Sequence, residues 1–75
     1  MLDIIREIVF EVTGKTNVNM DTDFLGDLAL NSFDIMSIVG IIEERYDITI
    51  PTRDIRQLNK VRDVVAYMER RGITQ

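Results

Sequence analysis

Apolar residues recur three and four positions apart in three separate stretches of this 75-residue chain. Such spacing gathers them on one side of an α-helix and leaves the charged residues between them facing outward. The apolar positions are Ile5, Ile8, Val9 and Val12, then Ile35, Ile38, Val39, Ile42 and Tyr46, then Val61, Val64, Val65 and Met68. A chain this short must pack all three helices together to bury one core. The predicted fold class is therefore all-α: a small bundle of three main helices, formed by residues 1–75 as a single domain.

Residues that favour helix ends support the prediction of the first and last of these helices. Over residues 2–13, Asp3 favours the positive end of the helix dipole, and Gly14 is placed to end the helix. For the last helix, Asn59 is predicted to be the N-cap and Gly72 follows the end. Both helices are thus bounded by residues that favour their ends.

The loop between the first two helices is predicted to be long but held against the core. Residues 15–30 lose the helical period and are rich in Asn, Asp, Thr and Gly. They also contain Phe24, Leu25, Leu28 and Leu30, which are too apolar for a free linker. We expect these side chains to pin the loop.

Residues 48–58 are predicted to form a connector and a minor helix. Ile48 and Ile50 alternate like strand residues, but Pro51 disfavours helix before it and a lone three-residue strand has no partner. We therefore expect an extended connector over residues 48–50 and a short helical turn over residues 52–58.

The start of the central helix, predicted over residues 33–46, has two interpretations. Asn31 and Asp34 are three apart, so Asn31 could cap the helix and leave the Ser32 hydroxyl free as the first helical residue. Alternatively, Ser32 itself is the cap. The two interpretations give that hydroxyl different roles.

Composition excludes several classes of protein. The chain contains no Cys and no His, so it has no disulfide, no thiol nucleophile and no imidazole for acid and base chemistry. A self-contained enzyme is not expected. No stretch approaches the ~18 apolar residues of a membrane span, and the N-terminus lacks a signal-peptide pattern. We expect a soluble, unprocessed, cytoplasmic protein that does not enter a membrane.

Charge is distributed unevenly along the chain, although the formal net charge is only −4. Residues 1–47 contain ten acids and three bases, whereas residues 48–75 contain three acids and six bases. A nucleic-acid ligand would require a predominantly basic face, so none is expected. The excess of acids in residues 1–47 favours basic protein partners, and the chain is expected to be a monomer.

Asp21 and Asp23, followed by Gly26, faintly resemble a calcium-binding loop. Leu25 occupies the fifth position and Ser32 the twelfth, where a calcium loop needs oxygen ligands and a Glu. No metal site is expected there.

Over nearly its whole length the chain resembles the acyl carrier proteins. The residues that carry the resemblance are Phe24-Leu25-Gly26-Asp27-Leu28, Asn31-Ser32-Phe33 and Ile42-Glu43-Glu44-Arg45-Tyr46-Asp47-Ile48-Thr49-Ile50-Pro51. The first piece is similar to the loop before the family's attachment serine. The last is similar to its Glu-Glu-x-aromatic segment leading to Ile-Pro.

The resemblance implies that a separate phosphopantetheinyl transferase moves 4′-phosphopantetheine from coenzyme A onto Ser32. The chain would then hold acyl groups as thioesters and present them to acyl-loading and condensing or modifying enzymes of fatty acid, polyketide or related biosynthesis. An aminoacyl or peptidyl carrier is the alternative within the family. Outside it, the alternative is an arm-free acidic interaction module in which Ser32 is only a cap.

Two departures from the family bear on partners. Asn31 and Phe33 replace the usual Asp and Leu around the serine, so a dedicated transferase could be needed. Arg53 and Arg56 are unusual in the minor helix and indicate a specialised carrier. The partner-binding residues that the resemblance implies are Asn31, Phe33, Asp34, Met36, Ser37, Gly40, Glu43 and Glu44.

Overall fold

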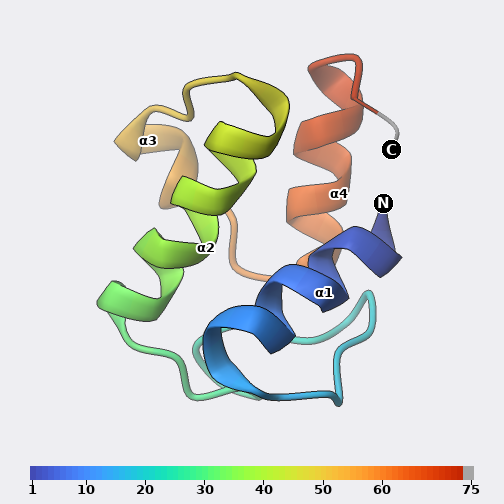
Figure 1. The fold of residues 1–75 in the computed structure, drawn as a ribbon, viewed down its shortest axis with the longest axis vertical. Helices are drawn as coiled ribbons and strands as arrows, with labels where there is room; N and C mark the ends of the chain where they lie inside the picture. Colours follow the sequence, from blue (N-terminus) through green and yellow to red (C-terminus); the bar gives the residue numbers. More distant parts are fainter. Residues whose placement is uncertain (74–75) are drawn as a thin grey trace.

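The computed structural model, which describes residues 1–73, is a bundle of three main helices with a short fourth (Figure 1). The helices are α1 (Leu2–Thr13), α2 (Ser32–Tyr46), α3 (Thr52–Ile55) and α4 (Val61–Arg70). In Figure 1, α2 and α4 stand on opposite sides with α1 crossing between them, and α3 lies beside α2. The predicted all-α bundle is confirmed. Among residues 1–73, no helix combines the length and the apolar character that a bilayer crossing requires.

The three predicted apolar stripes meet in one core. Every helix except α3 contributes buried apolar side chains, and the long loop adds four more. The buried apolar residues are Ile5, Ile8, Val9, Val18, Phe24, Leu28, Leu30, Ile38, Val39, Ile42, Ile50, Val61, Val64, Val65, Tyr67 and Met68. At the edges of the stripes, Val12, Ile35 and Tyr46 are only partly buried. The core therefore depends on the loop as well as on the helices.

The helix ends are mostly where the sequence predicts them. Gly14 ends α1 in the left-handed conformation, with φ 75°, and its amide donates to the Phe10 carbonyl at 2.8 Å. Asn59, however, is not the cap of α4: Lys60 is the N-cap, with extended backbone. The Asp63 carboxylate accepts from the amides of Asn59 and Lys60 at 3.1 and 2.9 Å. A carboxylate in the first turn thus reaches back and replaces an Asn cap.

The loop over residues 15–30 is held against the core, as predicted. The Thr22 carbonyl accepts from the Val61 amide at 3.0 Å, and the Phe24 amide donates to the Asn59 carbonyl at 3.0 Å. These two hydrogen bonds connect the loop to the start of α4. Leu25 departs from the prediction, because its side chain is 58% exposed instead of pinning the loop.

The connector before α3 is extended, and α3 is shorter than predicted. The Glu43 carboxylate accepts from the Ile50 amide at 2.8 Å, and Ile50 is buried. Helix α3 ends at Ile55: the Arg56 amide still donates to the Thr52 carbonyl, but the amides of Gln57 and Leu58 donate to carbonyls only three residues back. The predicted range of 52–58 therefore overran the helix by three residues.

A side-chain network ties α3 to α4. The Tyr67 hydroxyl donates to the Asp54 carboxylate at 2.8 Å, and the Arg71 guanidinium donates to the Tyr67 hydroxyl at 2.9 Å. Burial, reinforced by the hydrogen bond to Asp54, raises the pKa of the Tyr67 phenol. Because α3 has no buried residue, this network helps to hold it in place, together with the partly buried Ile55 that packs against the core.

Tyr67→Phe is expected to lower the free energy of unfolding by about 1 kcal/mol, since the ring stays packed while the hydrogen bond to Asp54 is lost. The raised pKa means that the folded state holds the phenol proton more tightly than the unfolded chain does. This stabilisation is complete below the unfolded pKa of about 10 and is lost as pH rises through the folded pKa. Urea unfolding between neutral and strongly alkaline pH measures it. As pH rises above the unfolded pKa, Tyr67→Phe should lose less stability than the natural chain does. Tyr46→Phe is the control and should follow the natural chain. If the stability of Tyr67→Phe and of the natural chain falls equally with pH, the assignment to Tyr67 is wrong.

Candidate functional site

Ser32 is the first residue of α2, and its side chain is exposed. Asn31 has extended backbone, with φ −96° and ψ 176°, and its side-chain oxygen accepts from the Asp34 amide at 2.9 Å. Asn31 is therefore the N-cap, which resolves the two interpretations of the helix start. Within residues 1–73 the Ser32 hydroxyl makes no hydrogen bond, so it is available for chemistry.

Asn31→Ala is expected to lower the free energy of unfolding by about 1 kcal/mol, because the Asp34 amide loses its acceptor. Asn31→Asp is the matched control. It keeps the acceptor and adds a negative charge at the helix N-terminus, so its stability should equal or exceed that of the natural chain. Thermal and urea unfolding of the three proteins measure the difference. Equal stability of Asn31→Ala and the natural chain would show that Asn31 is not an effective cap.

The segment before Ser32 is folded around the side chain of Asp23. One Asp23 oxygen accepts from the amides of Leu25 and Gly26, both at 3.0 Å. The Asp27 carboxylate in turn accepts from the Asp23 amide at 2.9 Å, and the Leu30 amide donates to the Phe24 carbonyl at 3.0 Å. The Asp-rich spacing that resembles a calcium loop thus serves as a hydrogen-bonded turn. That turn delivers the chain to the start of α2 in a defined position.

A groove of about 300 Å³ opens beside Ser32, between α2, α3 and the preceding loop. Its walls are mostly apolar, with one charged and two polar side chains. The lining residues are Phe24, Leu25, Ser32, Ile35, Met36, Ile55, Arg56, Leu58 and Asn59. The groove is large enough for a flexible organic group tethered at the serine.

Behind the groove lies a small apolar cavity of about 30 Å³. Phe24, Ile35, Ile55 and Leu58 line both spaces and form the wall between them. This volume is far below the ~150 Å³ of an engineered apolar cavity that admits benzene. In this conformation the bundle interior therefore has no room for an acyl chain, and the groove is the space open to Ser32.

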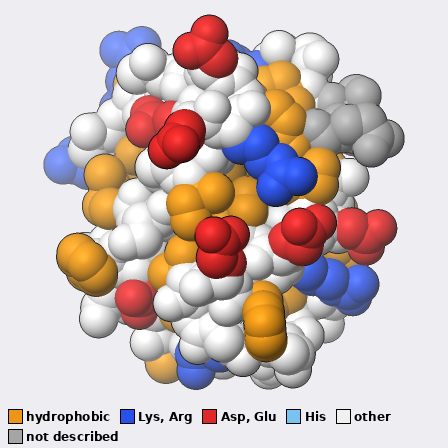
Figure 2. All heavy atoms as spheres, in the orientation of Figure 1, with side chains coloured by type: hydrophobic (Ala, Val, Ile, Leu, Met, Phe, Trp, Pro, Cys, Tyr) orange, Lys and Arg blue, Asp and Glu red, His pale blue; other side chains and the backbone are white. Residues whose placement is uncertain are grey.

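Large apolar side chains are exposed around the serine. Phe33 is 78% exposed, Leu25 58% and Met36 53%. Figure 2 shows exposed apolar groups along its left edge, where α2 begins, with a basic group next to them. Three large exposed apolar side chains near the start of one helix are consistent with an interaction site.

The other predicted partner residues lie along α2 but differ in their surroundings. Gly40 and Glu44 are exposed, and together with Phe33 and Met36 they follow one another at helical spacing. Asp34, Ser37 and Glu43 are half-buried. Glu43 also has a structural task, because one of its oxygens accepts from the Ile50 amide.

Sequence reasoning did not place Leu25, Arg56, Leu58 or Asn59 at the site. All four line the groove with Ser32, but three of them follow α3, far from the serine in the chain. Only the unusual basic character of Arg56 gave a signal, and it did not indicate where that residue lies. The packing of α3 beside α2 brings these residues to the serine.

The sequence profile of a family described as "Phosphopantetheine attachment site" matches residues 3–68. The acyl carrier protein of Bdellovibrio bacteriovorus is 34% identical over 70 residues, covering 91% of this chain and 90% of that protein. The acyl carrier protein of Tropheryma whipplei strain Twist is 39% identical over 70 residues, covering 91% and 85%. Both matches extend across the loop, α2 and α3.

A solved structure from Mycobacterium tuberculosis has the same fold as this chain. Its TM-score against this chain is 0.83 at 19% sequence identity, and the match covers 89% of this chain and 92% of that one. The helix arrangement around the groove is therefore shared with a solved protein of low sequence identity.

Proposed function

This chain belongs to the acyl carrier proteins, non-catalytic carriers whose cofactor is 4′-phosphopantetheine, and from that membership we propose that Ser32 is the attachment residue. One observation supports this above the others: Asn31 caps α2, so the exposed Ser32 hydroxyl is left free at the mouth of a groove. In the attachment reaction, the Ser32 oxygen bonds to the phosphorus of the arm, adenosine 3′,5′-bisphosphate leaves, and the hydroxyl proton passes to a base. Because the chain has no His, the transferase supplies that base.

The surroundings of Ser32 fit a phosphodiester with an organic arm. The backbone N–H groups and the positive dipole end of α2 favour the negative phosphate. The adjoining groove offers apolar walls to the hydrocarbon part of the arm. When bound, the arm supplies a terminal thiol on which acyl groups are held as thioesters. The chain contributes the tether, the groove and the surface that partners recognise.

The partners in this proposal are a phosphopantetheinyl transferase and enzymes that load, condense or modify acyl groups in fatty acid, polyketide or related biosynthesis. They meet the face of α2 that begins at Asn31 and continues through Phe33, Met36, Gly40 and Glu44. Exposed aromatic and Met side chains are enriched at the centre of such interfaces. Asp34, Ser37 and Glu43 complete this face at its margins. The carrier acts as a monomeric single domain over residues 1–75 in the cytoplasm.

Mass spectrometry tests the proposal directly. Purified protein is incubated with coenzyme A, Mg²⁺ and a broad-specificity transferase, and the intact mass is recorded. A single phosphopantetheine addition is the expected result. The variant Asn31→Asp with Phe33→Leu restores the family's common residues around Ser32 and removes transferase preference as an explanation of a failure. If this folded variant also remains unmodified with several transferases, the proposal is wrong.

A further inference from the structure

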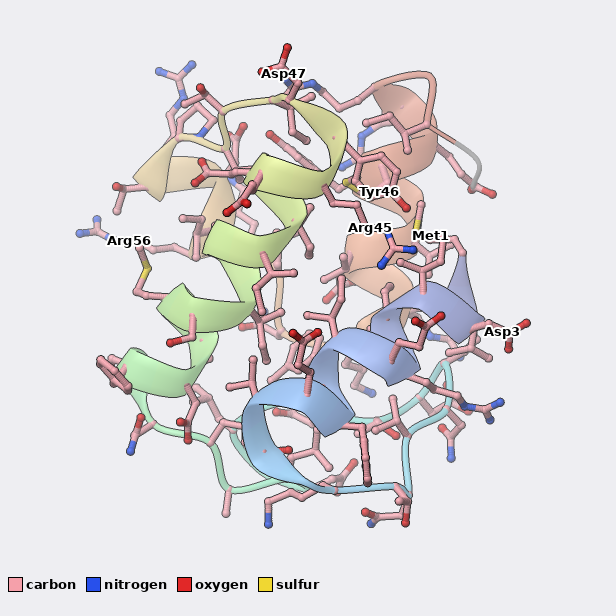
Figure 3. The ribbon with its side chains drawn as sticks, in the orientation of Figure 1. Met1, Asp3, Arg45, Tyr46, Asp47 and Arg56 are labelled. Carbon is pink, nitrogen blue, oxygen red and sulfur yellow. The ribbon has the colours of Figure 1, made fainter. Side chains whose placement is uncertain are left out.

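Arg56 alone carries a charge among the nine described residues that line the groove beside Ser32. Its side chain is exposed. In Figure 3 it extends outward on the α3 side of α2, whereas Arg45 lies on the α1 side. The groove next to the serine is therefore an apolar surface with one cation at its edge.

Arg56 has no ion-pair partner within residues 1–73, whereas Arg6, Arg53 and Arg62 each pair with a carboxylate. The nearest acid in sequence, Asp54, is engaged by the Tyr67 hydroxyl and lies within 3.8 Å of the Arg53 guanidinium. The Arg56 guanidinium thus keeps its full set of donors for an anion from outside the fold.

We propose that Arg56 pairs with the phosphate of the arm on Ser32, so that the arm lies in the groove between α2 and α3. This inference rests on the attachment proposed above. Ser32 and Arg56 line the same groove, so the anion is tethered on the surface that holds the cation. Tethering gives the phosphate a high effective concentration at Arg56. The planar guanidinium also suits two phosphate oxygens at once.

The rest of the groove matches the chemistry of the arm next to its phosphate. That part of the arm is a carbon bearing two methyl groups, and the facing residues are Leu25, Met36, Ile55 and Leu58. A Met side chain adapts readily to such a group. The polar side chain of Asn59 at the same groove can meet the amides that follow. The positioned arm would then leave α2 along a defined direction.

Arg56→Gln and Arg53→Gln form a matched pair for the test. Both remove one exposed positive charge from the same short segment, but Arg53 does not line the groove. The natural chain and both variants are labelled with ¹⁵N, loaded with the arm, and compared with their unloaded forms by NMR. Intact mass establishes the loading, and a dispersed spectrum of each unloaded variant establishes its fold. Holo-protein carries no acyl cargo, so any anion contact belongs to the phosphate.

In the natural chain and in Arg53→Gln, loading should shift the amide resonances of residues 55–59. It should also produce contacts between the methyl groups of the arm and those of Met36 and Ile55. Arg56→Gln should lose both signals. High salt should weaken them in the natural chain, because the Debye length falls from about 30 Å at 0.01 M to about 3 Å at 1 M.

Each failure has a distinct signature. If the loaded natural chain shows no shift at residues 55–59, or if Arg56→Gln keeps it, the placement of the arm is wrong although the attachment stands. If a carboxylate on a partner were the anion instead, Arg56→Gln would slow the transferase and leave the loaded spectra unchanged, which also overturns this inference. If Ser32 is never loaded, the mass measurement shows that the proposed function itself is wrong.

Discussion

Ser32→Ala is expected to abolish attachment of phosphopantetheine completely while leaving the fold intact. Among residues 1–73, no other side chain combines a free hydroxyl, exposure and a place at the mouth of the groove. Because Asn31 carries the cap, removing the Ser32 hydroxyl breaks no hydrogen bond. The free energy of unfolding should change by less than about 0.5 kcal/mol, as for other surface substitutions. Intact mass after incubation with coenzyme A and a transferase measures the first effect, and urea unfolding measures the second.

Ser37→Ala is the control, because Ser32 and Ser37 are the only serines in the chain. Ser37 is half-buried within α2 and should be dispensable for the modification. The variant should gain one arm, as the natural chain does. Modification that persists in Ser32→Ala and disappears in Ser37→Ala would move the attachment site. A large loss of stability in Ser32→Ala would show instead that this serine supports the helix start.

Leu28→Ala is expected to cause the largest loss of stability among the changes considered. Leu28 is only 1% exposed, and truncating a buried Leu costs about 2 to 5 kcal/mol through lost burial and the cavity left behind. A domain of this size is stable by about 4 to 11 kcal/mol, at ~0.05 to 0.15 kcal/mol per residue. The variant should therefore melt at least about 8 °C lower, at roughly 4 to 8 °C per kcal/mol.

Leu25→Ala is the matched comparison, since it removes the same atoms from the same loop at a side chain that is 58% exposed. Its free energy of unfolding should fall by less than about 1 kcal/mol. Calorimetry or urea unfolding of both variants gives the contrast. Similar losses in the two variants would mean that the loop is not anchored through Leu28. Leu28 lies four residues before Ser32, so losing its anchor should also disturb the position of the serine. The folded fraction of Leu28→Ala should therefore accept the arm more slowly than the natural chain does.

The large apolar residues of this loop show why local sequence patterns predict only part of the structure. Phe24, Leu25, Leu28 and Leu30 were all predicted to pin the loop, and three of them do. The Asp23 carboxylate holds the amides of Leu25 and Gly26, and Leu25 is left exposed in that turn. Composition predicts that a loop packs on the core, but the path of the backbone decides which side chain is left outside.

The N-cap of α4 also could not be predicted from residue type alone. Asn59 is a good cap by residue type, yet the Asp63 carboxylate three residues beyond Lys60 accepts from both preceding amides. The carbonyl of Asn59 is meanwhile occupied by the Phe24 amide from the loop. Competition between a local cap and a distant contact shifted the helix start by one residue. Such competition can be recognised only in the tertiary structure, where the local and the distant hydrogen-bond partners are both present.

Local sequence patterns predicted the three main helices and the serine at the start of α2, but they left Asn31 and Ser32 as two candidates for the cap, and the structure chose Asn31. Each of these depends on residues within about one helical turn, where periodicity and capping chemistry act. Tertiary structure alone decided the groove: Ser32 and Arg56 are distant in the chain, and the packing of α3 beside α2 brings them to one surface. It also decided how little free volume lies inside the bundle, since the volume of a cavity depends on how side chains from several elements fit together.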